Sequence, residues 1–555
     1  MSEQGYRDFA SRVEHVCAQY ADKTAIVYMR NDGSRTEFAF GKIFEHICAA
    51  KEKFADVGLR PGDRAAIIAP HSPYAIIAGL ALGCSNITSV LIDTALPTQE
   101  INRLLEFSDV RAVFTVSSKY DCLEVSIVTD IPVFNIVTIA EDLIHFEDSA
   151  TEVKRGATTD PHFDVITILF SSGTTSSVKG VMVTYQSVIN SCKLYLINTG
   201  LKAHMDYLLV LPFSHVAGYS GTIHHLINGC EIGMIEDVDA SKLVKGLTDF
   251  QPVFFAMVPR VYELIEEKIR KEINKKGKHA EKTIFRLFTL SAFFRKKLGI
   301  NIGNRLFKNI TYKVYGKNIY GLGTGGTSCK KSTAEFYLNL GLEWANFYST
   351  TETFVPCVGT GIHDRYPAGT EGYVKRHPGI EIKISAPDEN GIGEILVKTI
   401  LIMKGYFRDP ELTAASFDED GYFKTGDLGY IDRKGYLHVT GRIKEAIMLH
   451  TGKKVAPSDV DSLYSEICPD LSIAACGVPN RDSTFDEIHL FIERGELSPD
   501  AQQETREKIL DFSVQTSTLY QISGIHFIDK LPSTSVGKVK RFQLRELALS
   551  ERGGK

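Results

Sequence analysis

The chain has 555 residues, of which 43% are hydrophobic and 24% are charged, and its formal net charge is -5. This length exceeds what one hydrophobic core usually organises, so we expect a globular protein of at least two domains. The slight negative charge excludes the basic signature of a general nucleic-acid-binding protein.

The ten cysteines are scattered without a CxxC pair, as is typical of thiols in a reducing compartment. The N-terminus, MSEQGYRDFASRVEHV, lacks the apolar core of a signal peptide. The longest apolar stretch, around Tyr74 to Cys84, is too short to span a bilayer. We therefore predict a cytoplasmic protein that is soluble or at most peripheral to a membrane.

From the N-terminus onward, β-type apolar runs alternate with amphipathic helical patterns. Strands are expected at residues 65–70, 89–93 and 112–116, and helices between them at 74–83 and 98–107. This alternation is typical of α/β layers built on largely parallel sheets.

Residues 166–187, ITILFSSGTTSSVKGVMVTYQS, contain a polar loop between two apolar runs. Gly173 and Gly180 allow tight turns that point backbone N–H groups inward, and Lys179 adds a mobile positive charge. Further hydroxyl donors are Ser171, Ser172, Thr174, Thr175, Ser176 and Ser177. The lysine precedes its glycine and a strand-like run follows, unlike the P-loop, whose lysine opens a helix. We predict a phosphate-binding loop; the alternative is a Ser/Thr-rich surface turn.

Residues 379–436 read as short hairpins with turns at Asp388-Glu-Asn-Gly391, Asp418-Glu-Asp-Gly421 and Asp432-Arg-Lys-Gly435. A smaller α+β unit follows. We place a hinge at Ile431-Asp432, which gives a first domain of residues 1–431 and a second of residues 432–555.

Three further segments carry side chains suited to a nucleotide. In Tyr348-Ser-Thr-Thr-Glu352-Thr353, the aromatic ring suits a base, Thr351 a phosphate and Glu352 a Mg²⁺ ion. Asp427 offers a carboxylate for ribose hydroxyls, and Arg442 offers a guanidinium for ribose or phosphate. Lys538 follows a glycine near the C-terminus, in Leu531-Pro-Ser-Thr-Ser-Val-Gly537-Lys538. The alternatives are a strand-end turn, a turn salt bridge and a solvated basic turn, respectively.

In order and spacing, these segments resemble the adenylate-forming superfamily, which includes acyl-CoA synthetases, peptide-synthetase adenylation domains and firefly luciferase. The resemblance runs from Asp22-Lys-Thr-Ala-Ile-Val and Gly58-Leu-Arg-Pro-Gly-Asp-Arg64 to Lys538. It implies an α/β fold with a large N-terminal domain of layered α/β subdomains plus a β-rich subdomain. A small, mobile α+β C-terminal domain would follow as a lid.

The resemblance also implies roles for individual residues. ATP phosphates would be held by Ser172, Gly173, Thr174, Thr175 and Lys179, and the rest of the nucleotide by Gly325, Tyr348, Asp427 and Arg442. Thr351 would lie beside the α-phosphate, Glu352 would bind Mg²⁺, and Lys538 would be the adenylation lysine. His215, in Leu211-Pro-Phe-Ser-His-Val-Ala-Gly218, matches the histidine at the acid pocket; a structural histidine is the alternative.

The chain departs from the family pattern at three positions. Ser176 and Val178 replace a usual glycine and proline of the phosphate loop, and Ser349 replaces the glycine after the adenine-stacking tyrosine. The charged residues remain, so we expect an altered rate and not lost chemistry.

The implied reaction joins a carboxylic acid to ATP, forming an acyl-adenylate, and then passes the acyl group to a thiol with release of AMP. Coenzyme A is the expected acceptor. One alternative is the phosphopantetheine arm of a carrier protein, and another is a non-catalytic nucleotide-binding relative.

No aspartate follows Phe213 to pair with an amino-acid substrate, so we expect an acid without an α-amino group. The long helical segment between Val258-Pro-Arg-Val-Tyr262 and Gly325-Gly-Thr-Ser328 resembles that of long-chain acyl-CoA synthetases, which favours a fatty or other hydrophobic acid. This segment is rich in lysine and arginine from Lys268 to Arg286, interleaved with Phe285, Leu287, Phe288, Phe293 and Phe294. They suit either an anionic membrane surface or a solvated helix face with its aromatics packed inward.

Overall fold

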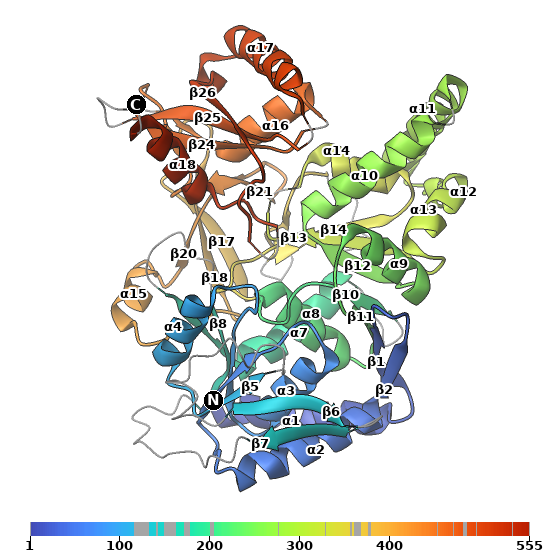
Figure 1. Ribbon diagram of the computed structural model, residues 1–555, viewed down its shortest axis with the longest axis vertical. Helices are drawn as coiled ribbons and strands as arrows, with labels where there is room; N and C mark the ends of the chain where they lie inside the picture. The colour runs from blue at the N-terminus through green and yellow to red at the C-terminus, as the bar shows by residue number, and fades with distance from the viewer. Residues whose placement is uncertain are drawn as a thin grey trace. The chain divides into compact units, whose positions relative to one another are not determined.

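The computed structural model describes residues 2–115, 133–139, 143–148, 163–170, 178–199, 205–275, 277–327, 329–355, 358–359, 368–375, 379–451, 453–469, 471–480, 485–495, 497–534 and 537–553. These residues pack as two compact units (Figure 1). Unit 1 comprises residues 1–368, 375–380 and 398–417, and unit 2 comprises residues 369–374, 381–397 and 418–555.

The first sheet of unit 1 has eight strands in the described part of the chain, in the order β19-β9-β8-β4-β3-β5-β6-β7. Its parallel centre consists of β3 (Arg64–Ile68), β4 (Thr88–Leu91), β5 (Ala112–Thr115), β6 (Val133–Ile139) and β8 (Val165–Phe170). Every residue of β3, β4 and β5 is buried, as expected for parallel strands covered on both faces. The strands predicted there are confirmed.

Antiparallel strands close both edges of this sheet. One edge is β7 (Leu143–Asp148), and the other is β9 (Gly180–Thr184) followed by β19 (Gly405–Tyr406). The strand predicted at 181–183 is confirmed, but Gly180 is its first residue, paired with Phe170, and not part of a turn. Since β8 and β9 form a hairpin, the predicted phosphate loop connects their adjacent ends.

The second sheet of unit 1 also has eight described strands, in the order β15-β14-β13-β12-β10-β11-β1-β2. Six of them are parallel: β1 (Thr24–Met29), β10 (Tyr207–Leu209), β11 (Ile232–Ile235), β12 (Phe254–Met257), β13 (Gly321–Gly325) and β14 (Glu343–Tyr348). The antiparallel edges are β2 (Arg35–Ala39) and β15 (Val358–Gly359).

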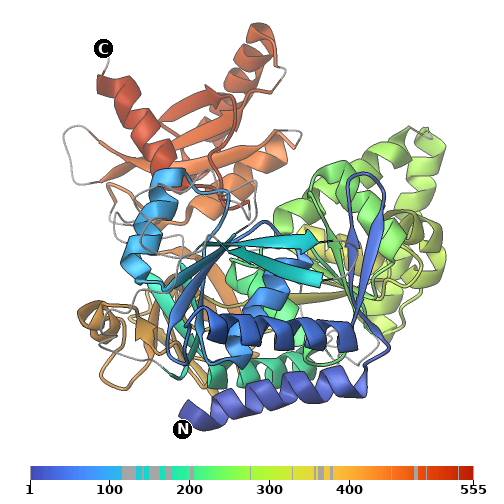
Figure 2. The same cartoon turned by 60° about the horizontal axis from the view of Figure 1, so that its bottom comes forward.

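Five helices form a connected layer in unit 1: α1 (Ser2–Gln19), α2 (Phe40–Asp56), α3 (Pro73–Cys84), α7 (Tyr185–Thr199) and α8 (Val216–Leu226). Figure 2 shows α1 and α2 side by side. Within this layer α3 contacts strands of the first sheet and α8 contacts strands of the second. On the opposite face of the first sheet, α4 (Thr98–Ser108) packs Leu104 and Leu105 against Ala66, Val90 and Val113. The helices predicted at 74–83 and 98–107 are thus confirmed.

The helical segment predicted after Val258 is also present. It contains α10 (Pro259–Asn274), α11 (Lys278–Phe293), a π-helical turn (Phe294–Leu298), α12 (Gly303–Leu306) and α13 (Lys308–Tyr315). Alongside it lie α9 (Ala240–Phe250) and α14 (Lys331–Asn339), which contact the second sheet at β10, β11 and β14.

A five-stranded antiparallel sheet forms the first part of unit 2, in the order β16-β21-β20-β18-β17. Its described strands are β16 (Gly372–Tyr373), β17 (Ile380–Ser385), β18 (Gly393–Thr399), β20 (Phe423–Ile431) and β21 (Tyr436–Arg442). At each predicted turn an aspartate side chain accepts two backbone N–H groups and a glycine has positive φ. The turns at 388–391 and 432–435 join β17 to β18 and β20 to β21, which confirms these two hairpins, whereas the turn at 418–421 lies between α15 and β20. One unpredicted helix, α15 (Pro410–Ala415), belongs to unit 1.

The remainder of unit 2 is α+β. A three-stranded sheet of β24 (Ile473–Pro479), β25 (Asp486–Glu493) and β26 (Gly524–Ile528) separates two cores. One core contains α16 (Pro457–Ile467) and α17 (Pro499–Gln515), and the other contains α18 (Arg541–Gly553). The hairpin β22 (Ile447–Met448) and β23 (Lys454–Val455) precedes them. The predicted fold class is confirmed, whereas the hinge at 431–432 concerns motion and stays a prediction.

No helix among the described residues is both long and apolar enough to cross a bilayer. The described cysteines are free thiols, and all of them except Cys48 are buried.

Glu371 is a buried carboxyl group beside β16. Burial raises the pKa of Glu371 to about 8, although its side chain accepts a hydrogen bond of 3.0 Å from the Val439 N–H, which acts in the opposite direction. The group is therefore protonated in the folded chain at neutral pH.

We predict that Glu371→Gln stabilises the chain at alkaline pH. Between the ordinary pKa of 4.5 and the folded value of about 8, the unfolded chain releases a proton that the folded chain keeps. The free energy of unfolding of the wild type should therefore fall as pH rises through this interval, by about 1.4 kcal/mol for each pH unit, relative to the glutamine variant. Denaturant titrations at several pH values measure this, with exposed Glu419→Gln as the control. Parallel pH profiles of wild type and Glu371→Gln would contradict the prediction.

Candidate active site

Lys179, Tyr406 and Glu352 form a connected cluster in unit 1. The Lys179 Nζ lies 5.2 Å from the centroid of the Tyr406 ring, and the Tyr406 hydroxyl donates a 2.8 Å hydrogen bond to Glu352 Oε1. The pairing of β19 with β9 places Tyr406 opposite Val181, two residues after Lys179. The structure thus brings together the predicted phosphate-loop lysine and the predicted Mg²⁺ ligand.

Tyr406 remains a hydrogen-bond donor because burial, and then the neighbouring Glu352 carboxylate, raise its pKa far above the ordinary value. Its backbone N–H donates to Thr413 Oγ1 of α15 at 2.9 Å, which fixes the strand end. No motif in the sequence predicts a role for this residue. A local hint in the sequence is the preceding Gly405, where the structure has a φ of 151° and a Cβ would lie 2.8 Å from Thr413 Cγ2.

Tyr348 and Gly325 stand at the carboxyl ends of neighbouring parallel strands, β14 and β13. Tyr348 is buried. A Cβ on Gly325 would lie 2.7 Å from the Phe347 carbonyl oxygen, so glycine alone fits. Carboxyl ends of parallel strands are the usual place for a nucleotide in such sheets.

The turn after Tyr348 carries Thr351 and Glu352. Thr350 and Thr353 bracket it: each backbone N–H donates to the other residue's side-chain oxygen, at 2.9 and 3.2 Å. The Glu352 carbonyl oxygen also accepts the Met403 N–H at 2.7 Å. These bonds fix the backbone from which both predicted site residues project.

His215 is the N-cap of α8. Its Nδ1 accepts the Ala217 N–H at 3.3 Å, so the neutral ring carries its proton on Nε2. A Cβ on Gly218 would lie 2.0 Å from the Pro212 carbonyl oxygen, which makes glycine obligatory in this tight entry to the helix.

α8 also contacts the turn that carries Glu352. The ring of Tyr219 lies 6.3 Å from that of Phe354, and Ser191 of α7 donates to the Val355 carbonyl oxygen. Ser191 also contacts His224 Nε2 at 2.6 Å, and burial lowers the pKa of His224 well below its ordinary value. No sequence motif predicts His224 or its neighbour His225, whose pKa is lowered to about 4 by burial. Both are neutral histidines of the helix layer.

In unit 2 the structure joins Asp427 and Arg442. They face each other across β20 and β21, and Arg442 Nε lies 2.9 Å from Asp427 Oδ1. The Asp427 side chain is buried and that of Arg442 is about half exposed. The arrangement suits both predicted interpretations, a ribose-binding pair and a structural salt bridge.

Lys538 lies on a hairpin closed by the bridge between Ser533 and Val539. The Lys538 N–H donates to Thr534 Oγ1 at 3.1 Å, and Gly537 has a φ of 79° that glycine tolerates best. Just after it, the partly buried Arg541 pairs with Asp461 at 2.5 Å and with Glu445 at 3.4 Å. Arg541 thereby holds the hairpin against the three-stranded sheet and against the segment that follows Arg442.

Four predicted phosphate-loop residues, Ser172, Gly173, Thr174 and Thr175, lie outside the described residues, as does Ser176. Of the others, His215, Gly325, Tyr348, Thr351, Glu352 and Lys179 belong to unit 1, and Asp427, Arg442 and Lys538 belong to unit 2.

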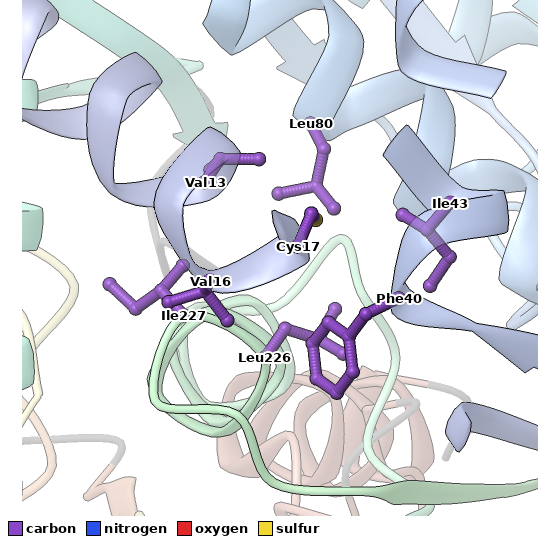
Figure 3. A pocket seen from close by; sticks show the side chains of 8 residues that line it. All are labelled: Val13, Val16, Cys17, Phe40, Ile43, Leu80, Leu226 and Ile227. Atoms are coloured by element: carbon purple, nitrogen blue, oxygen red, sulfur yellow. The ribbon is translucent and has the colours of Figure 1, made fainter. Parts of the chain in front are cut away.

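A small pocket elsewhere in unit 1 lies between α1, α2, α3 and the end of α8 (Figure 3). Its lining is apolar, and burial raises the pKa of its thiol, Cys17, to about 11. With no charged group to receive a phosphate or a carboxylate, the pocket is a feature of core packing.

Residues 13–407 match the model of the family described as AMP-binding enzyme. The chain belongs to this family. A 3-[(3aS,4S,7aS)-7a-methyl-1,5-dioxo-octahydro-1H-inden-4-yl]propanoyl:CoA ligase of Rhodococcus jostii is 23% identical over 97% of this chain and 98% of its own length. The long-chain-fatty-acid–CoA ligase FadD15 of Mycobacterium bovis is 26% identical over 79% of this chain and 75% of its own.

Among solved structures, the anthranilate CoA ligase AuaEII in complex with anthranoyl-AMP superposes with a TM-score of 0.75. It is 18% identical, and the match covers 98% of each chain. The predicted membership of the adenylate-forming superfamily is thus confirmed. The ligases that match over most of the chain support the predicted enzyme class, an AMP-forming acid–CoA ligase.

We predict that Tyr406→Phe slows acid-dependent ATP–pyrophosphate exchange by about tenfold or more, because a hydrogen bond to a charged group contributes about 1.5–3 kcal/mol. Glu352→Gln should also raise the Mg²⁺ concentration needed for half-maximal exchange. Exchange rates over a Mg²⁺ titration measure both effects.

The matched control is Tyr422→Phe, which removes a similar 2.7 Å hydrogen bond from a tyrosine to Glu381 in unit 2. In the double variant Tyr406→Phe/Glu352→Gln, the losses of exchange rate should be less than additive, because both substitutions alter the same hydrogen bond. Additive losses, or equal effects of Tyr406→Phe and Tyr422→Phe, would show that the bond has no role in the site.

Proposed function

We propose that the chain activates a hydrophobic carboxylic acid with ATP and transfers the acyl group to coenzyme A. The observation that carries this proposal is the Lys179–Tyr406–Glu352 cluster, which joins a cation for phosphate and a carboxylate for a metal ion inside the family's matched region.

The first step we propose is attack by a carboxylate oxygen of the acid on the α-phosphorus of ATP. The bond to the bridging oxygen breaks, and pyrophosphate leaves with its electron pair. Two anions approach each other, so positive groups must offset the charge that develops. Lys179 and Lys538 supply the positive charge, and the hydroxyl of Thr351 donates to the α-phosphate. The phosphates are held by Ser172, Gly173, Thr174 and Thr175.

The nucleoside would be held by four groups. Tyr348 stacks on the adenine, the bare backbone at Gly325 allows close approach, and Asp427 and Arg442 bind the ribose. His215 stands at the entry to α8, where we place the carboxylate end of the acid.

Glu352 suits Mg²⁺, which usually takes one or two carboxylates and completes its coordination with substrate phosphates and water. The described residues contain no cluster of three or more acidic, histidine or cysteine side chains that would form a site alone, which agrees with a metal held partly by the nucleotide. When bound, it would neutralise phosphate charge; Tyr406 orients the carboxylate that holds it.

In the second step, the thiol sulfur attacks the acyl carbon, the acyl–phosphate bond breaks, and AMP leaves. We propose that residues from Asp432 onward rotate between the steps, so that Lys538 leaves and the segment 441–455 faces the site. Because Arg541 joins the Lys538 hairpin to Glu445, both segments would move together.

The acid itself is proposed to be fatty or otherwise hydrophobic. The absence of an aspartate after Phe213 and the α10–α13 insertion support this. The relatives act on a fused-ring propanoate and long-chain fatty acids, and the solved neighbour holds anthranoyl-AMP; a hydrophobic body is common to these acids.

We predict that pyrophosphate exchange rises with fatty-acid chain length until the pocket is filled, because each buried methylene contributes about 0.8 kcal/mol. The assay compares fatty, aryl, fused-ring and amino acids, and then supplies coenzyme A or a carrier protein as acceptor. A preference for a compact aryl acid would exclude a fatty acid and leave adenylation intact. Thioester formed only with a carrier protein would identify a loading enzyme, and no exchange with any acid would favour a non-catalytic relative.

We also predict that Lys538→Ala abolishes adenylate formation and retains thioester formation from a supplied acyl-adenylate, because the lysine serves only the first step. The two half-reactions are assayed separately. The control is Lys540→Ala, at the end of the same hairpin. The backbone N–H of residue 540 donates to the Pro532 carbonyl oxygen, and the substitution leaves this bond in place. Equal loss of both half-reactions would refute the assignment of Lys538.

A further inference from the structure

Helix α11 lies at the edge of unit 1 (Figure 1). Its outer face combines basic and large apolar side chains that the fold of unit 1 does not bury. Phe285 and Phe293 are 72% and 55% exposed, and Leu290, Leu298 and Ile300 are exposed as well. Proteins rarely leave several large apolar groups together in water without an interaction that covers them.

The opposite face of α11 accounts for its attachment to the rest of unit 1. The ring centroid of Phe288 lies 4.6 Å from that of Phe307, and its ring stacks on Phe336 of α14 with the centroids 5.3 Å apart. Ser291 Oγ donates to the Asn339 carbonyl oxygen at 2.8 Å. Since these contacts hold the helix, the outward phenylalanines are not needed for packing.

Helical spacing sets the exposed residues in two adjoining rows. Lys278, Lys282, Arg286 and Leu290 follow one another at intervals of four, and Phe285, Thr289 and Phe293 form the second row. In the described part of the chain, none of Lys278, Lys282 and Arg286 forms an ion pair. The nearest acid on the helix is Glu281, one turn before Phe285, and Lys296 beyond the helix pairs with Glu335 at 2.8 Å.

We infer that this face docks unit 1 on the surface of an anionic phospholipid bilayer. Phe285, Leu290 and Phe293 enter the boundary between headgroups and acyl chains, while Lys278, Lys282 and Arg286 contact lipid phosphates. The positive charge of these three residues favours anionic lipid over neutral lipid. Helices that lie in a membrane interface typically combine exposed aromatic side chains with lysines in this way. The inference does not depend on the proposed reaction.

Cosedimentation of the full-length chain with vesicles tests the docking. Vesicles of phosphatidylcholine with phosphatidylglycerol should bind the protein, those of phosphatidylcholine alone should bind it far less, and high salt should release it. The double variant Phe285→Ser/Phe293→Ser should lower the bound fraction about tenfold or more, and Lys282→Glu/Arg286→Glu should remove the preference for anionic lipid.

Val514→Ser is the control, because Val514 is a still more exposed apolar residue on α17, in unit 2. The altered side chains are exposed, so thermal unfolding should be unchanged in every variant. Vesicle binding that is absent, indifferent to lipid charge or unaffected by the α11 variants would overturn the inference. A change of oligomeric state in those variants, without vesicle binding, would instead identify a contact between copies of the chain.

Discussion

The hydrogen bond from Tyr406 to Glu352 depends on strand pairing at the edge of the first sheet. β19 follows β9 by more than two hundred residues, yet its register sets the tyrosine ring beside Lys179 and its hydroxyl on Glu352. Three segments remote in sequence thus share one polar cluster. The buried phenol cannot ionise at ordinary pH, so it always donates, and the carboxylate it contacts keeps a fixed orientation.

Local chemistry allowed much of the fold to be predicted from the sequence. The buried strands β3, β4 and β5, the helices between them and the Asp-x-x-Gly turns each depend on residues close in the chain. Tyr406 could not be found in this way, because its importance comes from a long-range strand pair. His224 and His225 were missed for a related reason: only the packing of α7 against α8 shows that they are neutral and buried.

The segment after Val258 shows where periodicity alone was insufficient. Its aromatics are interleaved with basic residues, and the sequence left open whether the rings pack inward or face outward. The structure divides them: Phe288 packs against α14, whereas Phe285 and Phe293 face solvent. Residues three apart lie close together on the surface of a helix, so spacing alone does not separate Phe285 from Phe288. The contact of Phe288 with Phe336 of α14 decides which ring is buried.

Two buried carboxyl groups of the five-stranded sheet avoid an unpaired buried charge in different ways: one pairs with a cation and the other stays protonated. Asp427 has a guanidinium 2.9 Å away, whereas the Glu371 carboxyl is bonded by backbone N–H groups and burial raises its pKa, so it keeps its proton at neutral pH. The first arrangement leaves a charged pair near the sheet end, where Arg442 still contacts solvent. The second keeps the sheet interior neutral.

Arg541 has a consequence for how this chain could change in evolution or by design. Its ion pairs with Asp461 and Glu445 connect the Lys538 hairpin, helix α16 and the segment after β21. Replacing the hairpin together with Arg541 by a segment that has no cation at this position would leave these two partly buried acids without their partner. A change of substrate specificity or reaction rate made by exchanging this region therefore requires replacing all three segments together.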